Sequence, residues 1–148
     1  MKKMTLRERA VNLLARREHS RVELGRKLAR HAEEGDDIEA LLDDLVRRKL
    51  LSDERYAEAR SHTLARKYGA ARIAHDLRLQ GVDDALVQRV IQEVRQSEVA
   101  CARNAWRKRF GKLPESAQER GQQMRFLMAR GFSGDTIRAV LRGGADED

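Results

Sequence analysis

Apolar residues recur at intervals of three and four along most of this chain, which is the spacing of an amphipathic helix. Near the start, Leu6, Ala10, Leu13 and Leu14 fall on one helical face. The same spacing continues almost to the other end of the chain. It predicts helices over residues 6–17, 20–32, 37–49, 53–67, 70–80, 84–96, 97–110, 116–130 and 134–142.

Residues that favour helix ends stand between these segments. Ser20, with Glu23 three positions later, has the pattern of a capping box. We expect Gly69 to end the helix before it, because glycine tolerates the left-handed turn common at helix C-termini. The other predicted stops and caps are Gly81 with Asp83, Gly131 with Ser133, and either Ser52 or Asp53.

The chain repeats itself about every fifty residues. Leu14-Ala15-Arg16-Arg17 recurs as Leu64-Ala65-Arg66-Lys67, and the apolar positions of the second and third helices recur in two later copies. Helices this short are stable only when packing buries their apolar faces, so the copies should stack on one another. We therefore predict an all-α, elongated and curved molecule of three tandem three-helix repeats, over 1–50, 51–96 and 97–142, with a flexible acidic tail over 143–148.

Composition agrees with a helical protein and narrows its setting. Charged residues make up 37% and aromatic residues only 4%, with a single proline, which favours helices over strands. One cysteine allows no intrachain disulfide and fits a cytoplasmic location. No apolar run approaches the roughly 20 residues of a membrane span, and Lys2 and Lys3 are not followed by the apolar core of a secretory signal.

The net charge of +7 is distributed unevenly. Segments 1–29, 55–82 and 101–142 are basic, whereas 30–54 and 83–100 are acidic. This alternation suits a protein that contacts both a polyanion and another protein. The basic residues that we select as candidate contacts lie in the first two helices of each repeat. They are Arg21, Arg26, Lys27, Arg66, Lys67, Arg72, Arg78, Arg103, Arg107, Lys108, Arg109 and Arg125.

Each candidate feature also has a purely structural interpretation. The basic residues could form a solvated helical surface with scattered ion pairs. The aromatic side chains could stack on bases, but their helical spacing favours packing for Tyr56, Tyr68, Trp106 and Phe110. Core filling is likewise the favoured interpretation of Met124, Phe126 and Met128.

Catalytic and metal-binding patterns are missing from the sequence. The four histidines lack ligand spacing, and Cys101 is a single thiol, so we predict no metal site and no cofactor. There is no phosphate-binding loop of the GxxxxGK[ST] type. The acidic pairs Asp36-Asp37 and Asp43-Asp44 have the positions of a helix cap and a helix surface. We predict that the chain is not an enzyme.

The middle repeat carries a recognisable pattern. Leu51-Ser-Asp-Glu-Arg-Tyr-Ala57, Gly69-x-x-Arg-Ile73, Asp76-Leu77 and Gly81-Val82 together resemble the RecX family, the bacterial regulators of the RecA recombinase. The resemblance extends over nearly the whole chain. One departure lies in the first repeat, where Ala32-Glu33 replaces the Gly-Val pair, and we expect its turn to be rebuilt around Gly35. The motif residues are Leu51, Asp53, Tyr56, Ala57, Gly69, Ile73, Leu77 and Gly81.

The resemblance implies a non-enzymatic regulator in DNA repair, homologous recombination and the SOS response. We expect a monomer, because three self-stacked repeats need no partner subunit. Such a protein would bind in the groove of the RecA filament on single-stranded DNA, contact DNA through its basic helices, and inhibit ATPase, strand exchange and co-protease activity. Double-stranded DNA is a further expected partner, and membranes are not. Acidic third helices would then meet basic protein surface.

Two other functions remain open from the residues alone. A DNA-binding module without RecA specificity would bind naked DNA tightly and with a strong salt dependence. A helical-repeat adaptor for another protein would have little affinity for DNA. Sequence-specific reading by a helix-turn-helix is less favoured, because the middle helices lack a cluster of Asn, Gln and Ser, apart from Gln122 and Gln123.

Overall fold

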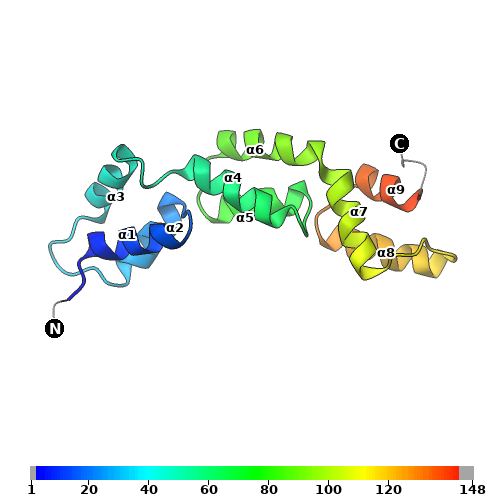
Figure 1. Ribbon diagram of the computed structural model, residues 1–148, viewed down its shortest axis with the longest axis horizontal. Coiled ribbons are helices and arrows are strands. Elements are labelled where there is room, and N and C mark those ends of the chain that lie inside the picture. The colour runs from blue at the N-terminus through cyan, green and yellow to red at the C-terminus, as the bar shows by residue number, and fades with distance from the viewer. Residues whose placement is uncertain (1–2, 144–148) are drawn as a thin grey trace.

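The computed structural model describes residues 3–143, and every regular element in that range is a helix. Three three-helix units follow one another along an elongated, gently curved molecule with its two ends far apart (Figure 1). The helices are α1 (Leu6–Arg16), α2 (Arg21–Ala29), α3 (Ile38–Arg47), α4 (Asp53–Leu64), α5 (Ala70–Leu79), α6 (Asp84–Gln96), α7 (Glu98–Arg109), α8 (Ala117–Ala129) and α9 (Gly134–Leu141).

Each unit has its own apolar core. Leu24, Leu28 and Leu45 are fully buried in the first, Ile73 and Leu77 in the second. The third is built around Ala102, Trp106, Leu127, Ile137 and Leu141. Because burying one such side chain contributes only about 1.5–3 kcal/mol, these small cores gain from the support of their neighbours.

Most predicted helix starts are confirmed. The side-chain oxygens of Ser52, Asp83 and Ser133 each accept a hydrogen bond from a backbone N–H in the first turn of the helix that follows. Ser20 caps α2 in the same way, by accepting from the N–H of Glu23. The carboxylate of Glu23, however, pairs with the guanidinium of Arg17, so its side chain serves an ion pair.

The prediction for Gly69 was wrong in its reason. Helix α4 ends at Leu64, and Gly69 is the N-cap of α5 in an extended conformation, with φ −87° and ψ 177°. A left-handed turn is therefore not what requires glycine there. A β-carbon on Gly69 would lie 2.4 Å from the carbonyl oxygen of Gly131, so the requirement comes from contact with the third unit.

Middle helices meet end to end at both junctions between units. The Ser20 hydroxyl at the start of α2 donates to the carbonyl of Gln80 at the end of α5, at 2.7 Å. The Gly69 N–H at the start of α5 donates to the carbonyl of Arg130 at the end of α8, at 2.8 Å. The positive end of one helix dipole thus faces the negative end of the next, which favours this order. Helices α2, α5 and α8 follow one edge of the molecule, and α3, α6 and α9 the other (Figure 1).

A carboxylate reinforces each junction at the same topological position. Asp53, the first residue of α4, accepts from the N–H of Arg21 at 2.7 Å. Glu98, the first residue of α7, accepts from the N–H of Ala70 at 2.8 Å and from the Thr136 hydroxyl at 2.6 Å. The first helix of each later unit therefore caps the middle helix of the unit before it, where N–H groups lack helical partners.

Glycine is required after α5 and after α8 for two reasons, the backbone conformation and the close approach of a neighbouring unit. Gly81 and Gly131 have φ of +76° and +85°, where side chains are disfavoured. A β-carbon on Gly81 would also lie 2.3 Å from Val22, and one on Gly131 would lie 2.6 Å from Arg72. Over residues 3–143, no unit docks onto the corresponding turn of the first repeat, which explains why Ala32 is accepted there. That turn uses Gly35, at φ +93°, as expected.

Three apolar residues lie elsewhere than expected. Met128, expected to fill the core, is 62% exposed, and Val46, an apolar residue of the helix predicted over 37–49, is 45% exposed. Leu51, from the motif of the second repeat, is buried in the core of the first. The expected tail over 143–148 falls outside the described residues except for Gly143. Within residues 3–143 no helix has the length and apolar character needed to span a membrane.

Candidate nucleic-acid interface

The structure divides the predicted basic residues into neutralised and open ones. The guanidinium of Arg21 lies 2.8 Å from Glu39 and 2.7 Å from Asp43. Arg78 pairs with Asp84 at 3.0 Å. These cations have intramolecular partners from other segments, so the structure gives them a structural role that their sequence positions did not reveal.

Lys27 and Arg26 are also partly engaged. The Lys27 ammonium lies 3.7 Å from the carboxylate of Glu23 and 3.0 Å from Nε2 of His19. The guanidinium of Arg26 reaches the carbonyl of Leu79 at 3.4 Å, across the first junction. Arg26 remains exposed and keeps most of its donors available.

The acidic third helix of the first unit is largely satisfied by its own chain. Arg7, Arg47 and Arg48 all pair with Asp44, and their hydrogen bonds, led by that of Arg47, hold the pKa of Asp44 well below its usual range. Glu39 and Asp43 pair with the cation of α2 described above. These carboxylates are therefore less available to a basic partner than the charge pattern suggested.

Cations without a carboxylate partner gather at the second junction. We name this group the junction patch; its members come from the turn after α4, the end of α7, the start of α5 and the end of α8. Among the described residues, no carboxylate lies within ion-pair distance of any of them. A hollow of about 230 Å³ opens between five of the six. The junction patch comprises Arg66, Lys67, Arg72, Lys108, Arg109 and Arg130.

Aromatic rings hold three of these guanidinium groups in place. Arg72 lies 4.7 Å from the centre of the Tyr68 ring, on which Arg130 also packs, at 5.5 Å. Arg130 lies 4.8 Å from the ring of Phe126, which in turn contacts Arg109. The result is an alternating series of cations and rings across the junction. Each contact of this kind contributes about 0.5–1 kcal/mol at an exposed site.

Arg130 is the member of the junction patch that sequence reasoning missed. Its guanidinium packs against both Tyr68 and Phe126, and one N–H donates to the carbonyl of Lys67 at 3.3 Å. The remaining donors lie on the guanidinium edge, the geometry that binds phosphate oxygens. The sequence feature that could have indicated its role is its position directly before Gly131, in the close-packed turn of the third unit.

Other aromatic candidates are committed to packing. Tyr56 is 4% exposed, and burial raises the pKa of its hydroxyl. Trp106 is 8% exposed, and its indole N–H donates to Gln123 at 2.8 Å. Gln123 itself is buried and donates to the carbonyl of Lys112. Neither ring can stack on a base, and Gln123 cannot read one, so the packing interpretation describes all three side chains.

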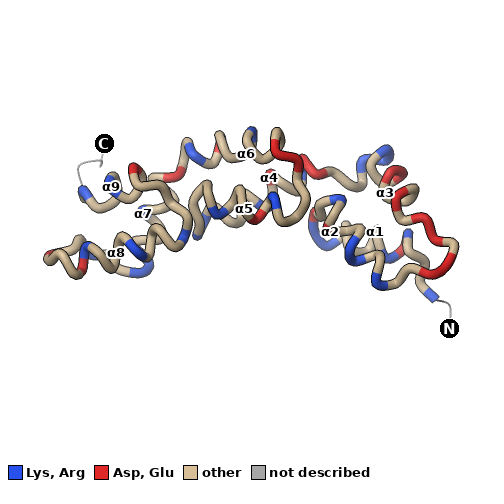
Figure 2. The backbone as a smooth tube through the Cα atoms, turned by 180° about the vertical axis from the view of Figure 1, so that it is seen from behind, with Lys and Arg blue, Asp and Glu red and all other residues tan. Residues whose placement is uncertain are grey.

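The remaining candidates extend the basic surface without forming a second cluster. Arg107 and Arg125 are exposed on α7 and α8, whereas Arg103 is half-buried and has an interaction partner. Basic positions recur along the edge formed by α2, α5 and α8, while acidic ones gather at α3 and the loop before it (Figure 2). The molecule therefore presents a long edge rich in cations, with the junction patch as its densest open group.

Chemistry other than charge is not apparent at this surface. In the described part of the chain, no three His, Cys, Asp or Glu side chains come together as a metal site requires. The buried carboxylate of Glu98 is engaged by three donors at the junction. What the surface can do is bind a polyanion through guanidinium and ammonium groups, with little dependence on sequence.

Comparison with known proteins places this architecture in a family. Models of the first, second and third three-helix domains of RecX match residues 7–45, 52–91 and 96–141. Proteins named regulatory protein RecX from Leptothrix cholodnii and Chromobacterium violaceum are 46% and 43% identical over 94% and 97% of this chain, and over 88% and 93% of their own lengths.

A crystal structure of RecX from Lactobacillus salivarius has the same fold, with a TM-score of 0.77, 21% identity and coverage of 93% of this chain and 92% of that one. The all-helical fold of this chain is thus a known architecture. With three domain models matched in order and close relatives covered almost throughout, this chain belongs to the RecX family.

Proposed function

We propose that this chain regulates the RecA recombinase by binding its filament on single-stranded DNA. The relatives that it matches over nearly their full length are named regulatory protein RecX, and we take RecA as the regulated protein from that family name. The proposed action is inhibition of RecA ATPase, strand exchange and co-protease activity by a cytoplasmic monomer that performs no chemistry itself.

The junction patch is the observation that carries the DNA part of this proposal. Six cations without carboxylate partners among the described residues repel one another, and phosphate oxygens would relieve that repulsion. Because Arg130 packs against two rings, its free edge favours phosphate over base contacts. The expected contact is therefore independent of sequence, on single strands and more weakly on duplexes.

The shape supports groove binding. Three units in line form a curved rod rather than a compact body (Figure 1). A rod can follow the groove of a helical filament and touch more than one subunit, with its cationic edge towards the DNA inside. Occupying the groove would hinder subunit addition and the motions that accompany ATP turnover.

The test is the DNA-dependent ATPase of RecA with this protein added below stoichiometry. Inhibition at a ratio well under one per RecA supports action on the assembled filament. Inhibition only when the protein is abundant enough to cover the DNA would mean competition for DNA, and would replace this proposal with that of a plain DNA-binding module.

A further inference from the structure

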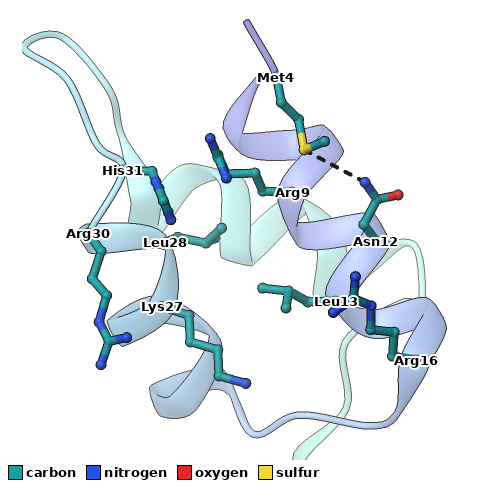
Figure 3. Close-up of a pocket in the computed structure, with 9 residues that line it drawn as sticks. All are labelled: Met4, Arg9, Asn12, Leu13, Arg16, Lys27, Leu28, Arg30 and His31. Atoms are coloured by element: carbon teal, nitrogen blue, oxygen red, sulfur yellow. Dashed lines mark hydrogen bonds between the residues drawn. The ribbon is translucent and has the colours of Figure 1, made fainter.

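The first repeat contains a cationic pocket that the function proposed above does not use. It lies between α1 and α2 and encloses about 390 Å³ (Figure 3). Its lining combines five basic side chains with an apolar floor and includes no carboxylate. The residues are Met4, Arg9, Asn12, Leu13, Arg16, Lys27, Leu28, Arg30 and His31.

Two kinds of surface meet inside this pocket. Leu13 and Leu28 point towards each other from the two helices (Figure 3). Leu13 is half-buried and forms the accessible floor, whereas Leu28 is fully buried. Met4 closes one end, where its sulfur accepts a hydrogen bond from the Asn12 amide at 3.7 Å. An apolar floor beside charged walls suits a ligand that is itself part apolar and part anionic.

The cations around the floor have few internal partners. Arg9 is half-buried, yet within residues 3–143 no carboxylate pairs with it or with Arg16 and Arg30. Lys27 is the exception, because it lies 3.7 Å from Glu23. Holding an unpaired guanidinium partly away from water is unfavourable, and an anion in the pocket would relieve that cost.

The second repeat does not reproduce the lining of this pocket. When Leu14-Ala15-Arg16-Arg17 is aligned with Leu64-Ala65-Arg66-Lys67, the second repeat has Ala59 and Thr63 in place of Arg9 and Leu13. The corresponding groove keeps a basic residue, Arg66, and an apolar one, Leu77, at the positions of Arg16 and Leu28, but it lacks counterparts of Arg9 and Leu13. This feature is not a by-product of the repeat architecture.

We propose that this pocket binds a nucleotide, with its phosphate on Arg9, Arg16 and Lys27 and its base on the half-buried Leu13. A nucleotide joins an anionic group directly to a flat, weakly polar ring, whereas an acidic peptide side chain would leave the floor uncovered. The volume is within the range of small-molecule sites, about 300–1,000 Å³.

The nucleotide unit can be part of a DNA strand or free in solution. The pocket lies in the first repeat and the junction patch lies between the second and third, so one strand could be held at two separate places. Two linked contacts raise the overall affinity well above that of either alone. In this respect the inference rests on the proposed function, because it extends the DNA contact to a second surface.

The experiment is a methyl NMR titration of the whole protein without RecA, using thymidine 5′-phosphate, thymidine, inorganic phosphate, (dT)20 and a ten-residue polyglutamate as probes. The methyl groups of Leu13 and Leu28 should shift with thymidine 5′-phosphate or (dT)20 at concentrations where thymidine and phosphate have no effect. Saturation by the mononucleotide would identify a free nucleotide as the source, and a response to (dT)20 alone would identify a strand.

Variants make the same test quantitative. In Arg9→Gln/Arg16→Gln, (dT)20 binding should weaken, and the slope of log affinity against log salt should become shallower by about 1.4, at about 0.7 per lost phosphate contact. Arg47→Gln/Arg48→Gln is the matched control, with the same charge removed from the same repeat, and its slope should stay closer to that of the unmodified protein.

Three results would overturn the nucleotide assignment. Equal losses in the two variants would mean a general charge effect. Methyl shifts caused by polyglutamate and not by DNA would mean an acidic protein ligand, and an absence of shifts with every probe would mean no site. None of these results affects the junction patch, so the proposed regulation of RecA would stand or fall separately.

Discussion

The close contact between the second and third units can be tested with three single alanine substitutions. Gly69→Ala places a β-carbon 2.4 Å from the carbonyl oxygen of Gly131 without any backbone strain, because φ is −87°. Gly35→Ala does the reverse, because φ is +93° and no atom lies within 4 Å of the added carbon. Gly131→Ala combines a φ of +85° with an approach of 2.8 Å to the backbone nitrogen of Arg72.

The expected losses of stability follow from these separate costs. At a compatible position, Gly→Ala stabilises by about 0.4–1 kcal/mol through the unfolded chain. Overpacking costs about 1–3 kcal/mol and weakening the Gly69–Arg130 hydrogen bond about 1 kcal/mol, so Gly69→Ala should destabilise by about 1–3 kcal/mol. Gly35→Ala should lose at most about 1–1.5 kcal/mol. Gly131→Ala should lose the most, about 2–4 kcal/mol.

Urea unfolding followed by circular dichroism at 222 nm measures all three variants against the unmodified protein. The contact explanation predicts that Gly69→Ala is less stable even though its backbone conformation suits alanine. If Gly69→Ala instead proved as stable as the unmodified protein or more so, the two units would not be docked as the structure shows, and the reasoning from close approach would be refuted.

Further predictions concern buried polar groups. Glu98→Gln replaces one acceptor oxygen by an NH2 group that would face the N–H and hydroxyl donors of the junction, so it should lower the free energy of unfolding in urea by about 1.5–3 kcal/mol. Glu93→Gln, on the exposed surface, is the control and should leave stability unchanged. Gln123→Leu should cost about 1–3 kcal/mol and shift the emission of the single tryptophan, and unchanged fluorescence would contradict the Trp106 hydrogen bond. Burial lowers the pKa of His19, so as pH falls below about 6.5 the unfolded state takes up the proton before the folded state does. The free energy of unfolding should therefore decrease as pH is lowered below about 6.5. His19→Gln should make that decrease smaller.

Helix positions followed from local patterns in the sequence. Ser52, Asp83 and Ser133 cap helices because a short oxygen-bearing side chain next to an apolar stripe acts within a few residues. The three-repeat architecture followed from periodicity in the same way. The predicted and observed helices differ mainly at their C-terminal ends, where α1, α2 and α4 stop sooner than the stripes suggested.

The side-chain roles that could not be predicted from the sequence depend on contacts between distant segments. Asp53 and Glu98 have the sequence positions of ordinary first-turn acids, but their carboxylates bind the preceding unit. Arg21 has the position of an open cation and is neutralised from α3. Arg130 gained its place in the candidate site only when the end of α8 met the turn between α4 and α5. Such pairings depend on the angles at which units stack, and no local pattern records those angles.

The most direct test of the central claim is inhibition of the RecA ATPase by two matched variants. The first neutralises four members of the junction patch, as Arg66→Gln, Lys67→Gln, Lys108→Gln and Arg109→Gln. The second removes the same charge from α3 and α6, as Arg47→Gln, Arg48→Gln, Arg89→Gln and Arg95→Gln. Helicity measured by circular dichroism should match the unmodified protein in both.

The first variant should need at least about ten-fold more protein for half-inhibition, because lost phosphate contacts weaken binding to the filament. The second variant should inhibit at nearly the concentration of the unmodified protein. Equal inhibition by both variants and the unmodified protein would contradict the claim that the junction patch carries the contact with the RecA–DNA filament.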